Sequence, residues 1–259
     1  MTVIKAAAAF PAPASTAPSS RAERYRDAMA GLGRAQKPGH GVPAYTRWVN
    51  RRLGRYAAAV GYALGWTPNM VTAASAVFSA AAIALLLAVP PSAATAAGIA
   101  VLLAVGYLLD SADGQVARLQ GTGSPAGEWL DHVVDAIRTP TIHMAVLIGF
   151  WSMGQPAWVL AVPLVYCIVS VAQFMSQILA EQLARSAKID SSEPSGIRKS
   201  LLLIPTDTGT FCWIFLLWGV PPVFVAVYTV MLVMNAGHSA VSMRRKYQKL
   251  HRRPLAVAN

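Results

Sequence analysis

Residues 69–109 read NMVTAASAVFSAAAIALLLAVPPSAATAAGIAVLLAVGYLL, a run without a single charged side chain. Pro90 and Pro91 divide this run into two apolar segments. A helix needs about 20 residues to cross a hydrocarbon core of about 30 Å. The segment 69–89 is long enough, whereas the segment 94–109 is long enough only if it continues past Asp110. Neither segment alternates as a strand does, and lipid requires the backbone to satisfy its own polar groups, so both are predicted to be helices.

The composition of the whole chain favours the same class of protein. Of its 259 residues, 55% are hydrophobic and 13% are charged, whereas soluble domains carry about 25% charged residues. Only two cysteines are present, Cys167 and Cys212, both inside apolar runs, which excludes a disulfide scaffold. We therefore predict an all-α integral membrane protein with six transmembrane helices, at 69–89, 94–109, 127–153, 157–179, 201–219 and 220–240.

The basic residues are distributed unevenly along the chain. Of the 22 Lys and Arg residues, ten precede Thr67, four lie between Leu183 and Ser200, and six follow Met243. The connections at 90–92, 154–156 and 219–222 contain none. The positive-inside rule then places both termini and the 109–130 and 181–200 loops in the cytoplasm. We expect a multi-pass protein of the cytoplasmic membrane whose basic tail contacts anionic lipid headgroups rather than nucleic acid.

Four parts of the chain are expected. Residues 1–43 are rich in Ala, Pro, Ser and Gly and are predicted to be disordered, because a signal peptide would be broken by Pro11 and Pro13. Residues 44–66 alternate with helical period between an apolar aromatic face and an arginine stripe, which predicts an amphipathic helix at the membrane surface. A solvated basic helix is the alternative. Residues 67–242 form the membrane domain, and residues 243–259 form a basic cytoplasmic tail.

Four aspartates gather between positions 110 and 135 of a chain with only eleven acidic residues. Asp110 and Asp113 are three residues apart and Asp131 and Asp135 are four apart, so each pair shares one face of a helix. Four carboxylates in one site of low dielectric repel each other, and a divalent cation, which prefers oxygen ligands, would neutralise them. Helix capping or pairing with Arg118 and Arg138 could account for one or two of the four. Arg118 is also suited to grip a phosphate, which suggests metal-dependent transfer on a diphosphate substrate.

The fixed positions of this stretch carry a resemblance to a known family. They are Asp110-x-x-Asp113-Gly114-x-x-Ala117-Arg118, followed after eight residues by Gly127-x-x-x-Asp131-x-x-x-Asp135. This pattern resembles the signature of the CDP-alcohol phosphotransferases, integral membrane enzymes of phospholipid synthesis. The sequence Thr67-Pro68-Asn69-x-x-Thr72 is also similar to the family.

The resemblance implies a role for each matched residue. Asp110, Asp113 and Asp131 would bind two divalent ions, Mg²⁺ or Mn²⁺, and Asp135 would complete the metal site and deprotonate the acceptor hydroxyl. The CDP pocket would be formed by Asp110, Asp113, Gly114, Ala117, Arg118, Gly127, Asn69 and Thr72. CDP-diacylglycerol would transfer its substituted phosphate to a polyol or polyol phosphate and release CMP, and a soluble CDP-alcohol with a lipid acceptor is the second possibility. The enzyme would be a homodimer.

The acceptor site and the rival functions are less determined by the sequence. Relatives that use a phosphorylated acceptor hold it with basic residues, and Arg138, Arg185, Arg198 and Lys199 lie in comparable regions, although the positive-inside rule alone would also place them there. Asp207 inside an apolar segment indicates a function unless it bonds to threonines. A divalent-cation transporter and a prenyltransferase that uses a diphosphate are the alternatives. A transporter would hold its acids near the middle of the membrane, and a prenyltransferase normally separates its two acidic motifs.

Overall fold

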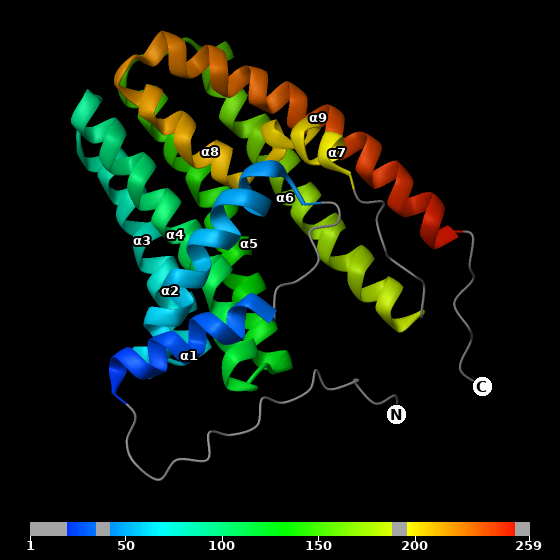
Figure 1. The fold of residues 1–259 in the computed structure, drawn as a ribbon. Coiled ribbons are helices and arrows are strands. Elements are labelled where there is room, and N and C mark those ends of the chain that lie inside the picture. The colour runs from blue at the N-terminus through cyan, green and yellow to red at the C-terminus, as the bar shows by residue number, and fades with distance from the viewer. Residues whose placement is uncertain (1–19, 35–41, 188–195, 252–259) are drawn as a thin grey trace.

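The computed structural model describes residues 20–34, 42–187 and 196–251, and every element in these ranges is helical (Figure 1). This confirms the all-α class. In chain order the elements are α1 Arg21–Arg34, η1 Thr46–Asn50, α2 Arg51–Leu64, α3 Pro68–Ala88, α4 Ala93–Gln120, α5 Pro125–Ser152, α6 Ala157–Ser186, α7 Ile197–Leu202, η2 Ile204–Thr206, α8 Thr208–Ile214, η3 Phe215–Gly219 and α9 Pro221–His251.

The ends of the helices follow from local sequence signals. The hydroxyls of Thr67, Ser92 and Ser124 each accept a hydrogen bond from a backbone N–H in the first turn of α3, α4 and α5. Such side-chain caps satisfy donors that a helix N-terminus otherwise leaves unpaired. At the other end, Gly65 and Gly121 take left-handed conformations, with φ of 76° and 65°, and terminate α2 and α4. The turn that joins α4 to α5 is therefore short and fixed.

In the described ranges, five helices are long and apolar enough to cross a membrane: α3, α4, α5, α6 and α9. The predicted segment 94–109 continues through Asp110 to Gln120, which gives α4 the length it needs. The predicted transmembrane helix at 201–219 is not one helix: it is divided into the end of α7, η2, α8 and η3. Pro205 has no N–H to donate, and Asp207 caps a new helix by accepting from the Gly209 N–H at 3.0 Å, so the chain bends here.

The N-terminal region is more ordered than the sequence predicts. Residues 21–34, inside the segment expected to be disordered, form α1, while 1–19 and 35–41 lie outside the described residues. Ala28 and Leu32 are one turn apart on α1 and are buried with Ala58 and Val116 of α2 and α4. This apolar contact is what the disorder prediction missed. Figure 1 shows α1 lying across the end of the bundle.

The predicted helix at 44–66 is present as η1 followed directly by α2. Gly54, Ala58 and Ala59 pack its small-residue face against α4. The apolar residues of the opposite face, including Leu53, Tyr56 and Val60, are 47–48% exposed. An exposed apolar face beside arginines suits a helix in contact with lipid headgroups, and its location at the membrane surface stays a prediction.

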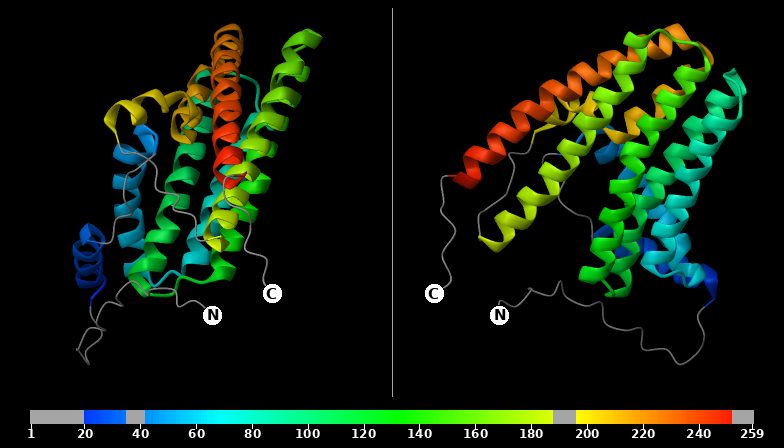
Figure 2. Two further views of the ribbon diagram at one scale, coloured as in Figure 1. Left: turned by 90° about the vertical axis from the view of Figure 1, so that its right-hand side faces the viewer. Right: turned by 180° about the vertical axis from the view of Figure 1, so that it is seen from behind.

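The bundle has two different ends. At one end α4 turns into α5, and a Cβ placed on Gly127 would lie 3.6 Å from Asn69 Oδ1 of α3. At the other end two connections without basic residues, 90–92 and 219–222, come together: a Cβ placed on Gly219 would lie 2.9 Å from the backbone carbonyl carbon of Ser92. We call the first the charged end. Figure 2 shows that α6 and α9 lean away from α3, α4 and α5 as they approach this end.

Candidate active site

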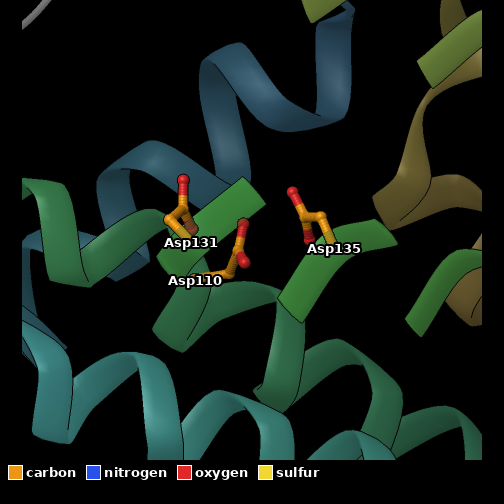
Figure 3. A group of neighbouring side chains, drawn as sticks. All are labelled: Asp110, Asp131 and Asp135. Atoms are coloured by element: carbon orange, nitrogen blue, oxygen red, sulfur yellow. The ribbon is translucent and has the colours of Figure 1, made fainter. Parts of the chain in front are cut away.

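Three of the four predicted metal-binding aspartates meet at the charged end. Asp110 comes from α4, and Asp131 and Asp135 come from successive turns of α5. One carboxylate oxygen from each lies within 4.8 Å of the other two, and all three residues are half-buried (Figure 3). Oxygen ligands at this spacing are what Mg²⁺ and Mn²⁺ prefer, so the cluster is consistent with a metal site.

Asp113 is held separately, one turn further along α4. Its Oδ2 accepts a hydrogen bond from the Thr72 hydroxyl of α3 at 2.7 Å, and its Oδ1 accepts from the Gly114 N–H at 2.5 Å. The residue is 7% exposed. The structure therefore joins two predicted site residues, Asp113 and Thr72, but it does not include Asp113 in the group of three. Its role as a metal ligand stays a prediction.

Arg138 partly neutralises the cluster. Its Nη2 lies 2.5 Å from Asp110 Oδ1 and 2.8 Å from Asp135 Oδ1, and its side chain is 10% exposed. One guanidinium balances only one of the three carboxylates, so the cluster still favours a cation. His132 is also near: its Nδ1 is 3.8 Å from Asp131 Oδ2 and its Nε2 is 3.9 Å from Glu128 Oε1.

The residues predicted to hold the CDP group lie around this cluster on α3, α4 and α5. A Cβ added to Gly114 would meet one side-chain atom within 4 Å, the Arg118 Nη1 at 3.5 Å, so the space beside this glycine is open apart from the Arg118 guanidinium. The Arg118 Nε is buried and has no hydrogen-bond partner among the described residues. The Ala117 carbonyl accepts the two N–H groups that close the end of α4. Gly127 lies beside Asn69. The positively charged Arg118 guanidinium therefore lies among small residues, an arrangement that suits a diphosphate.

A cavity of about 330 Å³ opens beside the cluster. Asp110, Asp135 and Arg138 form one part of its wall. Asp207, also singled out from the sequence, is a further member. The other lining residues were not singled out; they come from α5, α6 and α9, from the bent segment 205–211, and from Tyr107 of α4. The signal was present in the sequence: Ser170, Gln173 and Gln177 recur at helical spacing inside an apolar segment, as do Asn235 and Ser239.

Comparison with known proteins identifies the family. The profile described as CDP-alcohol phosphatidyltransferase matches residues 65–241, which include the whole aspartate cluster. This chain belongs to the CDP-alcohol phosphatidyltransferase family. The resemblance stated from the sequence is thereby confirmed.

The individual relatives of this chain differ in what their names describe. The chain is 28% identical over 213 residues to cholinephosphotransferase 1 of Gallus gallus. This match covers 79% of the chain and 59% of that relative. It is 40% identical over 82 residues to the archaetidylinositol phosphate synthase of Aeropyrum pernix, covering 32% of the chain and 40% of that relative. The chain thus spans less than two thirds of the length of either relative.

A solved structure supports the fold of this family member. The crystal structure of Mycobacterium tuberculosis phosphatidylinositol phosphate synthase with CDP-DAG bound superimposes with a TM-score of 0.52 at 19% identity. The match covers 82% of this chain and 98% of that one. At this level of identity the likeness concerns the arrangement of helices.

The basic residues predicted to bind the acceptor are placed differently from one another. Of the four, Arg138 lines the cavity. Arg185 is exposed and pairs with Glu128 at 2.9 Å and Glu181 at 3.9 Å, away from the cavity wall. The side chains of Arg198 and Lys199 fall outside the described part of the chain.

Asp207 has a structural role in this family member. It is 1% exposed and accepts hydrogen bonds from the Thr46 N–H at 2.8 Å and the Thr46 hydroxyl at 2.7 Å, in addition to capping α8. The Thr46 hydroxyl also contacts the Tyr107 hydroxyl at 2.7 Å. Asp207 therefore joins η1 to the bent segment that forms part of the cavity wall.

Proposed function

We propose that this chain transfers a substituted phosphate group from a CDP-linked donor to a hydroxyl acceptor, releases CMP and forms a phosphodiester phospholipid. The preferred donor is CDP-diacylglycerol, and the acceptor is a polyol or polyol phosphate. The observation that carries the proposal is the meeting of Asp110, Asp131 and Asp135 within 4.8 Å beside a cavity, inside the region that matches the family.

The metal site supports transfer from a diphosphate. In our proposal Asp110, Asp113, Asp131 and Asp135 hold two divalent ions, Mg²⁺ or Mn²⁺. Bound ions would stabilise the negative charge that develops on the diphosphate oxygens. Both Asp113 oxygens accept a hydrogen bond in the structure. Asp113 would therefore bind an ion through the remaining lone pair of one oxygen, or after turning away from Thr72.

The donor would lie across α3, α4 and α5. Arg118 would contact the diphosphate, and the lack of a side chain at Gly114 and Gly127 would allow cytidine and phosphate to approach the backbone closely. Asn69 and Thr72 would border the same pocket from α3, because Asn69 lies beside Gly127 and Thr72 bonds to Asp113.

The acceptor would react beside Asp135. Its hydroxyl oxygen forms a bond to the phosphorus atom that carries the donor's alcohol, and the bond from that phosphorus to the CMP oxygen breaks. The proton of the hydroxyl passes to the Asp135 carboxylate, and CMP leaves with the electron pair of the broken bond. Asp135 is suited to this step because it lines the cavity as well as the cluster.

We further propose that the charged end faces the cytoplasm and that the chain forms a homodimer, with the active site facing the cytoplasm of the cell. The orientation is supported by the distribution of basic residues, because the connections at the opposite end contain none. We also propose that the bent segment 204–219 completes the bundle as a sixth apolar segment within the membrane, as its apolar helix Thr208–Gly219 suggests.

The test is direct. Purified protein in detergent or vesicles is given Mg²⁺ or Mn²⁺, CDP-diacylglycerol and each acceptor in turn, and CMP release and product mass are measured. We expect stoichiometric CMP and phospholipid product, both abolished by a chelator. A protein that binds the divalent ion but releases no CMP with any CDP-linked donor would contradict the proposal.

A further inference from the structure

One face of α6 carries a row of polar side chains. Tyr166, Ser170, Gln173 and Gln177 are separated by four, three and four residues, which aligns them on one side of the helix. All four line the cavity beside Asp135, and we call them the α6 polar row. Polar residues in a membrane-spanning helix are costly and usually mark a place where a substrate or ion is bound.

Gln173 differs from the rest of the row in its side-chain oxygen. Its side-chain oxygen Oε1 is buried and accepts no hydrogen bond from any described residue. A second such atom lies on the same cavity: the buried Arg138 Nε has no acceptor in the described part of the chain, although Nη2 of the same side chain contacts Asp110 and Asp135. Buried polar atoms are nearly always paired, so these two indicate a ligand that both donates and accepts hydrogen bonds. A hydroxyl group does both.

The rest of the cavity wall holds the α6 polar row in place. His143 of α5 contacts the Tyr228 hydroxyl through Nδ1 at 2.5 Å and the Ser170 hydroxyl through Nε2 at 2.9 Å. Asn235 of α9 donates from Nδ2 to the Tyr166 hydroxyl at 3.0 Å. Since the Tyr166 oxygen accepts this bond, its own proton remains available to a ligand. Three helices therefore fix hydroxyl and amide groups around one space.

The depth of this space suits a substrate with several polar groups. His143 follows Asp135 by eight residues on α5, which corresponds to about 12 Å along the helix axis. A molecule with one hydroxyl at Asp135 would therefore extend its remaining atoms past Gln173 toward Ser170 and Tyr166. The cavity volume of about 330 Å³ is at the lower end of the range for small-molecule sites, about 300–1,000 Å³.

In the proposed function the acceptor reacts beside Asp135, in this cavity. We infer that the α6 polar row, with Gln173 at its centre, binds the distal hydroxyl groups of a polyol while another hydroxyl faces Asp135. The inference rests on the proposed function and adds to it the residues that recognise the acceptor's remaining hydroxyl groups. A diacylglycerol offers one hydroxyl and leaves Gln173 without a donor, so it is the competing occupant that the experiment must exclude.

The central variant is Gln173→Leu, which keeps the size of the side chain and removes its acceptor. We expect the KM for the polyol to rise about tenfold, the effect of losing one neutral hydrogen bond, with the KM for the CDP-linked donor unchanged. Gln155→Leu is the matched control, because Gln155 lies in the turn between α5 and α6 at the opposite end of the bundle. An unchanged donor KM also shows that the variant is folded.

A series of polyols that each lack one hydroxyl gives a second readout. The wild-type protein should use one of these analogues about tenfold less well than the parent polyol, and Gln173→Leu should use that analogue and the parent equally. Equal polyol KM values for wild type and Gln173→Leu, or discrimination that persists in the variant, would overturn the inference.

An acceptor panel separates failure of the inference from failure of the proposed function. Polyols, polyol phosphates and diacylglycerol are compared by CMP release. Turnover with a polyol or a polyol phosphate supports the inference, and the ratio of the two KM values tells whether a phosphate is also recognised. Preference for diacylglycerol would overturn the inference while leaving CDP-dependent transfer intact. The absence of CMP release with every acceptor would overturn the proposed function itself.

Discussion

Arg138 competes with a bound metal ion for the carboxylates of the cluster. Its Nη2 is within 2.8 Å of oxygens from both Asp110 and Asp135, and its side chain is 10% exposed, so its charge is poorly screened. We predict that Arg138→Gln tightens the binding of Mn²⁺ while it lowers turnover. Affinity for Mn²⁺ should rise because the guanidinium repels the ion. Turnover should fall because the same guanidinium lines the cavity in which the acceptor reacts.

The size of the effect follows from the charges involved. At an effective dielectric of about 20, two unit charges about 4 Å apart interact by about 4 kcal/mol. Solvent weakens this value, because the Asp135 side chain is 30% exposed. We therefore expect a gain in Mn²⁺ binding of at least about 1.4 kcal/mol, which is a tenfold lower Kd.

Titration of free Mn²⁺ by electron paramagnetic resonance in the absence of substrate measures this Kd. Arg185→Gln is the control, because Arg185 is 55% exposed and pairs with Glu128 and Glu181 rather than with the cluster. Its Kd should equal that of the wild type. A Kd that is unchanged or weaker in Arg138→Gln would refute the view that this arginine and the ion share the same carboxylates.

Three further predictions concern the donor, the bent segment and the orientation. Arg118→Ala should raise the Kd of CDP about tenfold or more and leave that of Mn²⁺ within about twofold, since Arg118 is assigned to phosphate; equal losses of both would count against that role. Asp207→Ala removes the cap of α8 and leaves the Thr46 N–H and hydroxyl without their acceptor, so we expect the free energy of unfolding to fall by about 3 kcal/mol. Thermal unfolding in detergent measures this change, and an unchanged midpoint would contradict the structural role of Asp207. A cysteine at Ser92 should react with an impermeant thiol reagent only from outside the cell, and labelling confined to the cytoplasmic side would reverse the proposed orientation.

The helical class and the cluster could be read from the sequence because both depend on short-range patterns. Long apolar runs leave no alternative to helices in lipid. Asp131 and Asp135 are one turn apart, so a helix alone brings them to one face. Asp110 joins them because the short turn that ends at Gly121 returns the chain at once, and the Ser124 cap fixes where α5 begins.

The break at 201–219 depended on a long-range contact. Hydropathy alone describes an apolar segment there, and Pro205 only hints at a bend. The bend is fixed by Asp207, whose carboxylate caps α8 and bonds to Thr46, far away in the sequence. No local pattern connects two residues 161 positions apart. The prediction of disorder for residues 21–34 failed in the same way, because Leu32 is buried only by packing on α2 and α4.

The cavity wall was missed for a different reason. Ser170, Gln173 and Asn235 are ordinary polar residues in apolar helices, and their spacing alone does not say which face meets a neighbour. Only the packing of α5, α6 and α9 shows that these faces converge on Asp135. The basic residues expected to bind the acceptor were chosen by charge, and Arg185 pairs with Glu128 and Glu181 instead.

The most direct test of the central idea, that the clustered carboxylates carry out the transfer, is the Asp135→Asn variant. The asparagine keeps one oxygen for the site but cannot accept the proton of the acceptor hydroxyl. Purified variant should retain CDP binding close to that of the wild type while CMP release falls to the rate measured without acceptor. CMP release near the wild-type rate would contradict the account.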